Sequence, residues 1–188
     1  MTETASDEEL LRLAAAGDQH AFALLVQRHQ SRVFNLAYRF SRDRQDAEEL
    51  AQEIFFKVWR HARSFRGDSL FSTWLYRLAV NSCLNHRQGK KARPEPHTLT
   101  GDLPAGSAAD AAGDGLVAAE METRLRAALD SLPARQRVAL ALASFEDKSY
   151  EDIAAAMEVS VPAVESLLFR ARQNLAAILR PLRKKGEL

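Results

Sequence analysis

Apolar residues recur at intervals of three and four along almost the whole chain of 188 residues. This spacing places them on one face of an α-helix, and no segment shows the sustained two-residue alternation of a half-buried strand. The length leaves room for one ordinary domain or two small ones, each with a modest core. The sequence therefore predicts an all-α fold.

Charge and helix-breaking residues divide the chain into three parts. The formal net charge is +4 over residues 1–93, −4 over 94–117 and +1 over 118–188. The middle part holds three of the six prolines and four of the eight glycines, and it contains no Lys or Arg. Low hydrophobicity with repeated breakers is typical of a flexible linker. We therefore expect two small helical domains, 1–93 and 118–188, joined by an acidic linker.

Helix-capping signals set the expected helices of the first domain. Ser6 with Glu9 forms a capping-box pattern ahead of a first helix, and Gly17-Asp18 ends it. Asp43 or a neighbour can cap a third helix, and Ser69 a fourth that runs to about Gln88. The expected buried faces hold Phe22, Leu25, Val26, His29, Val33, Leu36 and Phe40 on the second helix, Ala47, Leu50, Ala51, Ile54, Phe55 and Val58 on the third, and Phe71, Leu75, Leu78 and Ser82 on the fourth.

The second domain ends in a helix-turn-helix pattern. A first helix is expected over Ala118–Asp130, and Ser149 with Asp152 resembles a capping box for a later short helix. A three-residue break at 158–160 then precedes a long final helix, from Val161 to about Arg180. Two helices joined by so short a break, the second one long, fit a helix-turn-helix, although ordinary helical bundles also contain such pairs.

The third helix carries a polar stripe opposite its apolar face. Such a stripe is most often a solvated surface. Two large rings beside it exceed what the inward face needs, and exposed rings of this kind anchor protein interfaces. We therefore expect a protein-binding surface made by Asp46, Glu49, Gln52, Glu53, Phe56 and Trp59.

The fourth helix repeats polar side chains every four residues. Arg77, Asn81 and Asn85 share one face, with Trp74 on its flank. Tryptophan and tyrosine are usually core residues, yet the helix already has an apolar face, so we expect Trp74 and Tyr76 not both to be buried. An exposed ring beside amide and guanidinium groups suits unstacked bases better than duplex DNA.

The final helix begins with side chains small enough to let it approach base edges in a major groove, namely Ser160, Pro162, Ala163 and Ser166. Arg170 and Arg172 lie where they can reach phosphates. The basic residues from Arg180 onward are explained at least as well by the negative end of the helix dipole.

Composition argues against catalysis, metal binding and membrane insertion. Cys83 is the single cysteine, so neither an internal disulfide nor a zinc site built from several thiolates is possible. The five histidines lack metal-binding spacing, and no glycine-rich phosphate loop occurs. We expect no enzyme activity and no cofactor. The acidic N-terminus lacks the features of a signal peptide, and no apolar run reaches membrane-spanning length, so we expect a soluble cytoplasmic protein.

Several motifs together resemble the bacterial RNA polymerase sigma factors of the extracytoplasmic function group, the minimal two-domain members of the sigma-70 family. They occur in the order of that family and cover nearly the whole chain: GDQHAFALLVQRHQSRVFNLAYRF, DAEELAQEIFFKVW, SFRGDSLFSTWLYRLAVNSCLNHR and LPARQRVALAL with SYEDIAAAMEVSVPAVESLLFRAR. The resemblance implies sigma domain 2 at 1–93 and sigma domain 4 at 118–188. It also implies a factor that directs transcription initiation without catalysing a reaction.

The resemblance implies roles for three sets of residues. The segment 49–62 would bind the clamp helices of the largest polymerase subunit, and the flap of the core enzyme is a further expected partner. The opened nontemplate strand of the minus-ten element would be held by Phe65, Trp74, Arg77, Asn81 and Asn85. The minus-thirty-five element would be read by Ser160, Pro162, Ala163, Glu165, Ser166, Phe169, Arg170 and Arg172. An anti-sigma protein is expected to cover the same surfaces.

Two residues depart from the resemblance. Related sigma factors often carry Arg or Lys where this chain has Glu165 and Leu167. Glu165 can accept a hydrogen bond from a cytosine amino group or face away from DNA, so the promoter sequence does not follow from a relative. The alternative function is a stand-alone transcriptional regulator that uses only the C-terminal helix-turn-helix.

Overall fold

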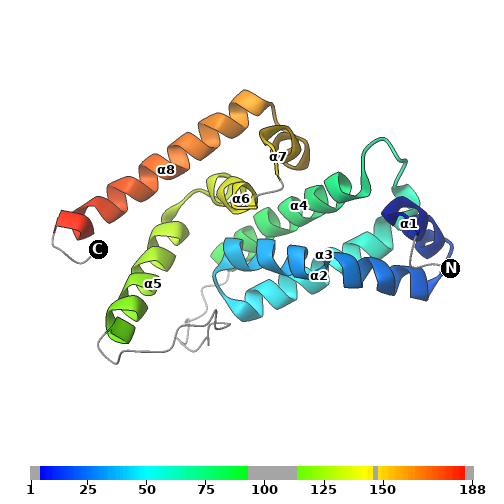
Figure 1. Cartoon of the computed structure of the whole chain (residues 1–188), viewed down its shortest axis with the longest axis horizontal. Helices are drawn as coiled ribbons and strands as arrows, with labels where there is room; N and C mark the ends of the chain where they lie inside the picture. The colour runs from blue at the N-terminus through cyan, green and yellow to red at the C-terminus, as the bar shows by residue number, and fades with distance from the viewer. Residues whose placement is uncertain (1–4, 93–113, 146–147, 185–188) are drawn as a thin grey trace.

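A computed structural model of the chain describes residues 5–92, 114–145 and 148–184, and side chains for 5–86, 123–145 and 148–178. The described residues form α-helices joined by short connections, with no strand among them, which confirms the all-α prediction (Figure 1). The helices are α1 (Asp7–Ala15), α2 (Gln19–Ser41), α3 (Arg44–His61), α4 (Phe71–Ala92), α5 (Asp114–Ser131), α6 (Ala134–Ala143), α7 (Tyr150–Met157) and α8 (Val161–Lys184), with a 3-10 turn η1 (Ala62–Ser64) after α3.

The helix ends follow the capping signals in most places. Ser6 and Glu9 form a complete capping box on α1, and Asp18 and Asp43 accept backbone N–H bonds at the starts of α2 and α3. Gly17 adopts the left-handed conformation, with φ at +102°, that lets the chain turn between α1 and α2. Local side-chain chemistry therefore decides where these helices begin.

The first four helices pack around one apolar core. It is formed by the buried faces of α2, α3 and α4, with α1 closing one end through Leu10 and Leu11. The predicted faces are largely correct, and the half-buried residues at their edges are Phe22, Val26, Ala51, Phe55 and Leu78. We call helices α1–α4 the N-terminal unit.

The last four helices form the C-terminal unit. Helices α7 and α8 are joined by three residues, and Glu158 adopts the left-handed conformation that ends α7, with φ at 54°. Ser149 and Asp152 form a complete capping box on α7. Val164, Leu168 and Ala171 are buried, and they hold α8 against its unit. The predicted helix-turn-helix is confirmed.

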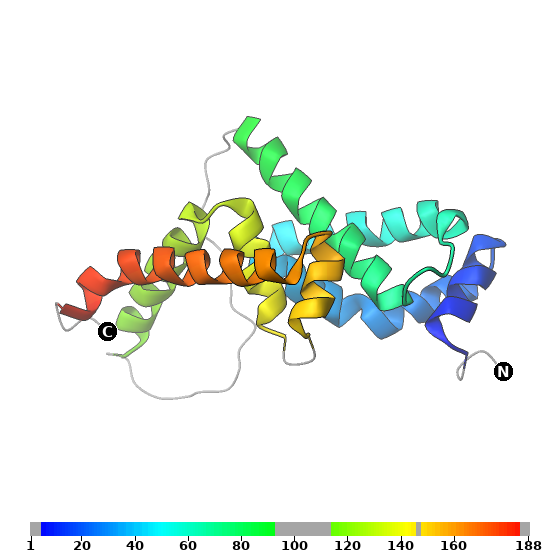
Figure 2. The ribbon, with the colours of Figure 1, turned by 90° about the horizontal axis from the view of Figure 1, so that it is seen from above.

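The two units pack directly against each other. Helices α6 and α7 contact α2 and α4, and Figures 1 and 2 show α7 lying against the middle of α4. Helix α8 runs away from this contact, and α5 lies beside it.

Two predictions about helix starts are wrong. Helix α5 begins at Asp114 rather than Ala118, so four residues assigned to the linker are helical, whereas 94–113 lie outside the described residues. The first amide of α4, that of Phe71, donates to Glu8 Oε1 at 2.9 Å, and the Ser69 hydroxyl does not cap it. Tyr76 is only 4% exposed and Trp74 is half-buried, so the two rings are not both buried, as expected.

Neither a membrane-spanning helix nor a metal-binding cluster is found among the described residues. None of the helices described there is long and apolar enough to cross a membrane. The same residues contain no group of three or more His, Cys, Asp or Glu side chains that could hold a metal ion.

Candidate protein and nucleic-acid interfaces

The outer face of α3 is an exposed surface with polar and aromatic side chains. Glu49 and Gln52 are exposed, and beside them Phe56 and Trp59 expose 62% and 37% of their surface. The Trp59 ring is held in place by an edge-to-face contact with Phe22, with the ring centroids 4.9 Å apart. An exposed aromatic side chain on a rigid helix can serve as an anchor for a partner protein. We call Asp46, Glu49, Gln52, Glu53, Phe56 and Trp59 the α3 surface.

The other two acidic residues of the α3 surface are tied toward α4. Glu53 Oε1 lies 2.5 Å from Lys57 Nζ, which donates to the Ser82 hydroxyl of α4 at 2.9 Å. Asp46 is largely covered, and one of its carboxylate oxygens lies 3.7 Å from His86 Nε2. The structure therefore places Glu49, Gln52, Phe56 and Trp59 at the centre of the surface, and Asp46 and Glu53 at its edge.

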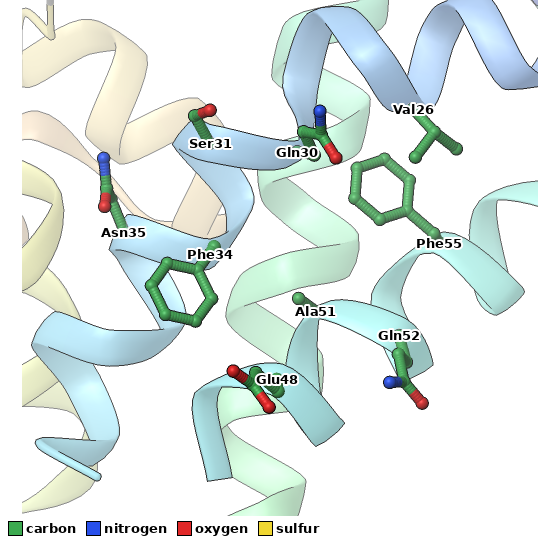
Figure 3. Close-up of a pocket in the computed structure, with 9 residues that line it drawn as sticks. All are labelled: Val26, Gln30, Ser31, Phe34, Asn35, Glu48, Ala51, Gln52 and Phe55. Atoms are coloured by element: carbon green, nitrogen blue, oxygen red, sulfur yellow. The ribbon is translucent and has the colours of Figure 1, made fainter. Parts of the chain in front are cut away.

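A groove of about 820 Å³ runs beside this surface, between α2 and α3. In Figure 3 the rings of Phe34 and Phe55 lie on its two sides, one from each helix. Glu48 and Gln52 line the α3 side as well. The sequence pattern predicts Phe55 as a core residue, and it gives no role to Phe34 or Glu48. The sequence signal for this groove is that α2 and α3 carry more apolar residues than one face of each helix can bury.

Helix α4 and the loop before it form a second surface. Phe65 from the loop packs edge to face on Trp74, with ring centroids 5.3 Å apart, and Trp74 also lies against the fully buried Phe71. Both rings of the Phe65–Trp74 pair are half-buried. One side of the pair is thus supported by the core while part of each ring stays accessible, which is the arrangement that stacking on a base requires. We call Phe65, Trp74, Arg77, Asn81 and Asn85 the α4 surface.

The polar side chains of the α4 surface differ in their surroundings. Asn81 and Asn85 are exposed. Arg77 is half-buried, and its Nε lies 3.3 Å from Glu158 Oε1 in the turn before α8, close enough for an ion pair but without hydrogen-bond geometry. Leu70, with 69% of its surface exposed just before α4, was missed because an apolar residue beside a helix start resembles a core residue.

The start of α8 is a third surface, and most of it is open to solvent. Seven of the eight predicted residues there are exposed, and Ala163 is half-buried beside the core. Phe169 exposes 61% of its surface, one helical turn after Glu165, and Glu165 is exposed too. Asn174 donates to Gln136 of α6 at 2.9 Å, which fixes the helix against its unit. We call Ser160, Pro162, Ala163, Glu165, Ser166, Phe169, Arg170 and Arg172 the α8 surface.

Cys83 lies inside the N-terminal unit and contributes to none of these surfaces. It is fully buried, and burial, together with the nearby Glu53 carboxylate, raises the pKa of its thiol to about 12. A thiol held so far from its thiolate form is a poor nucleophile at neutral pH.

Comparison with known proteins identifies the family of both units. The Sigma-70 region 2 family model matches residues 25–93, and the Sigma-70 region 4 model matches residues 122–175. The RNA polymerase sigma-H factor of Pseudomonas aeruginosa is 37% identical over 96% of this chain and 97% of its own length. The ECF RNA polymerase sigma-E factor of Escherichia coli K12 is 35% identical over 97% of this chain and 98% of its own length.

Solved structures share the fold. CnrH, determined in complex with the cytosolic domain of CnrY, superimposes with a TM-score of 0.67 at 26% identity, covering 94% of this chain and 99% of that one. The sigma factor RpoE of Bartonella quintana, determined with the anti-sigma factor NepR, superimposes with a TM-score of 0.61 over 85% of this chain and 96% of that one. The chain belongs to the sigma-70 family of RNA polymerase sigma factors, in its extracytoplasmic function group.

Proposed function

We propose that this sigma factor binds core RNA polymerase through the α3 surface and promoter DNA through the α4 and α8 surfaces. The proposal is supported by three sets of partly or fully exposed side chains that lie on or next to three different helices. The residues of all three sets lie within the two segments matched by the sigma-70 models. The domain assignment follows: residues 1–93 act as sigma domain 2, 118–188 as sigma domain 4, and 94–117 connect them.

The α3 surface and the groove beside it suit an amphipathic helical partner. Phe34 and Phe55 offer apolar walls, and Glu48, Glu49 and Gln52 offer acceptors for basic side chains on the rim. A helix that places its apolar face in such a groove is a common mode of recognition. We assign this surface to the clamp helices of the largest polymerase subunit, and we assign the flap contact to the C-terminal unit.

The α4 surface suits an opened DNA strand. The supported Phe65–Trp74 pair can stack on a base that has left the duplex, and the Asn81 and Asn85 amides can donate to and accept from base edges. Removing a base from the stack costs a few kcal/mol, which these contacts must offset. The minus-ten element is therefore recognised as a single strand.

The α8 surface suits duplex DNA in the major groove. Its small residues permit a close approach, and Arg170 and Arg172 are exposed toward solvent where phosphates can be contacted. Glu165 is exposed on this surface, so it can accept a hydrogen bond from a cytosine amino group, and Phe169 can contact a thymine methyl group. The minus-thirty-five element is recognised here.

Regulation and cellular setting complete the proposal. RpoE of Bartonella quintana was solved as a sigma factor in complex with the anti-sigma factor NepR, and CnrH was solved in complex with the cytosolic domain of CnrY. We propose that an anti-sigma protein controls this chain too, in the cytoplasm, where RNA polymerase acts. The chain itself carries no catalytic chemistry and promotes initiation by binding.

Transcription in vitro with core polymerase over a pool of promoter sequences tests the function and reads the specificity together. The proposal requires start sites that depend on this protein and that share both elements. A gel shift separates the stand-alone regulator: specific duplex binding by the free protein, unchanged by core polymerase, would favour that alternative.

A further inference from the structure

Helices α3 and α4 are joined by polar contacts as well as by apolar packing. Lys57 Nζ of α3 donates to the Ser82 hydroxyl of α4 at 2.9 Å, and it lies 2.5 Å from Glu53 Oε1 of its own helix. Ser82 is fully buried, whereas Lys57 keeps 28% of its side chain exposed. A buried hydroxyl requires a hydrogen-bond partner, and here the partner comes from the neighbouring helix. Lys57 therefore gives the contact between α3 and α4 a direction.

A second contact joins the same helices one turn further along α4. His86 Nε2 lies 3.7 Å from a carboxylate oxygen of Asp46, and the two side chains are only 17% and 14% exposed. Ser82 and His86 are four residues apart, so they share the face of α4 that is turned toward α3. We call Asp46, Glu53, Lys57, Ser82 and His86 the α3–α4 seam.

The seam lies next to two residues of the α4 surface. Asn81 immediately precedes Ser82, and Asn85 immediately precedes His86. Successive residues of an α-helix are rotated by about 100° around its axis, so the asparagines stand beside the seam. Both asparagines are exposed, whereas the residues that follow them are covered. The rotation of α4 that the seam holds is therefore the rotation that decides where both amides point.

Apolar packing alone does not hold this rotation. The buried apolar side chains of α4 at this level belong to Ala79, Val80 and Cys83. Contacts between such side chains are non-directional, whereas a hydrogen bond weakens steeply when its donor and acceptor are misaligned. The pKa of the Cys83 thiol is raised to about 12 by burial and by Glu53, and Lys57 opposes the rise. The charges of both α3 residues therefore act on the buried face of α4.

We propose that Lys57 is a positioning residue for strand capture: its hydrogen bond to Ser82 fixes the rotation of α4 and thereby directs Asn81 and Asn85 toward the opened strand. Lys57 acts through α4 and does not itself touch a base. The role in capture rests on the proposed function of the α4 surface. The effect on the two asparagines does not, and it is measured in the free protein.

Nuclear magnetic resonance of the free protein tests the positioning. Ser82→Ala removes the acceptor on α4 and leaves Lys57 paired with Glu53. Lys57→Met removes the donor at a similar side-chain length. We expect both variants to shift the side-chain amide signals of Asn81 and Asn85. Unmoved signals of both asparagines in both variants would overturn the positioning.

A second ion pair on α3 provides the matched control. Arg44 pairs with Glu48 at 2.9 Å, also across four residues of α3, and both side chains are exposed. Arg44→Met removes that cation in the same way as Lys57→Met, but it breaks no contact of the seam. It should leave the two asparagine signals in place, and a shift as large as that of Lys57→Met would contradict a specific role of the seam.

Promoter opening tests the role in capture, with core polymerase at saturating concentration. At a promoter selected from the transcribed pool, Ser82→Ala and Lys57→Met should each lower permanganate reactivity of the minus-ten region about fivefold, as loss of a hydrogen bond to a charged group does. Lys57→Arg keeps a donor and should restore most of the opening. The double variant Lys57→Met, Ser82→Ala should open no worse than the more impaired single variant, because both changes remove the same bond.

Binding measurements separate positioning from a general loss of structure. Ser82→Ala should keep the native affinities for core polymerase and for the minus-thirty-five duplex, and a parallel loss of both affinities and of opening would overturn the specific role. Normal opening by Ser82→Ala and Lys57→Met, in an assay where Asn81→Ala opens poorly, would overturn the role in capture. If Asn81→Ala also opens normally, the proposed function of α4 fails, and the asparagine signals of the free protein still decide the positioning.

Discussion

The α4 and α8 surfaces, which we propose bind DNA, differ in how the protein holds them. On α4 the rings lie between the core and solvent, and Arg77 is paired with Glu158 in the turn between α7 and α8. On α8 the side chains extend into solvent, and the helix is fixed only along its inner face. A surface that must capture a base from a duplex needs support behind its rings, because stacking has to offset the cost of unstacking. A surface that reads an intact groove needs only access.

The largest effect is expected from removal of the Trp74 ring, which the core supports on α4. We expect Trp74→Ala to reduce open-complex formation about 10- to 100-fold, since stacking contributes roughly 1–3 kcal/mol per base. Permanganate footprinting of the minus-ten region measures the opening. Trp74→Phe keeps a ring at the same place and should retain most of the activity. Normal opening with Trp74→Ala and with Asn81→Ala would remove the strand-capture role from α4.

The α4 and α8 surfaces can act on one promoter only if core polymerase presents both of them to DNA. Glu53→Arg places a cation at the edge of the α3 surface, and we expect core polymerase to bind about tenfold more weakly, which corresponds to about 1.4 kcal/mol. Fluorescence anisotropy with core enzyme gives the affinity. Glu151→Arg makes the same change on an exposed position of α7 and should leave the affinity unaltered. Equal affinities for the two variants would exclude Glu53 from the interface.

On the open surface, single substitutions should have smaller effects. We expect Arg170→Ala to weaken binding of holoenzyme to a minus-thirty-five duplex about fivefold, through loss of one phosphate contact. The slope of log affinity against log salt should fall by about 0.9. Gln173→Ala, an uncharged change on the same helix, should leave the slope intact. A salt slope that Arg170→Ala does not change would mean that Arg170 faces away from phosphate.

The smallest expected effect concerns the support of α4. Glu8 of α1 accepts a hydrogen bond from the first backbone amide of α4, that of Phe71, which lies 63 residues further along the chain. Glu8→Ala should lower the free energy of unfolding by about 1 kcal/mol, as loss of a helix cap does, with little change in binding to the minus-thirty-five duplex. Thermal denaturation followed by circular dichroism provides the measurement. Ser69→Ala is the matched control, and it should cost less because its hydroxyl does not cap the helix.

Much of the fold could be predicted because its signals are local. Each confirmed cap acts on backbone groups within four residues of itself. The caps are formed by Ser6 with Glu9 on α1, by Asp43 on α3, and by Ser149 with Asp152 on α7. The inward face of α8 also has a local origin, since the spacing of Val164, Leu168 and Ala171 places them on one side of that helix.

The features that the sequence did not predict depend on side chains from segments far apart in the chain. The sequence left open which of Trp74 and Tyr76 stays accessible, because Phe145 and Lys148, which cover Tyr76, come from beyond the acidic segment. The groove at Phe34 and Phe55 was not foreseen, because whether two half-apolar faces meet or stay apart depends on how α2 and α3 cross.

Periodicity and contacts a few residues apart were enough to predict the helices, most of their ends and the helix-turn-helix, and the order of motifs was enough to predict the family. Long-range packing decides which unit covers which face, which side chain caps α4 and where a groove stays open. Those features depend on contacts between residues far apart in the chain, and a local pattern carries no record of which distant segment packs against it.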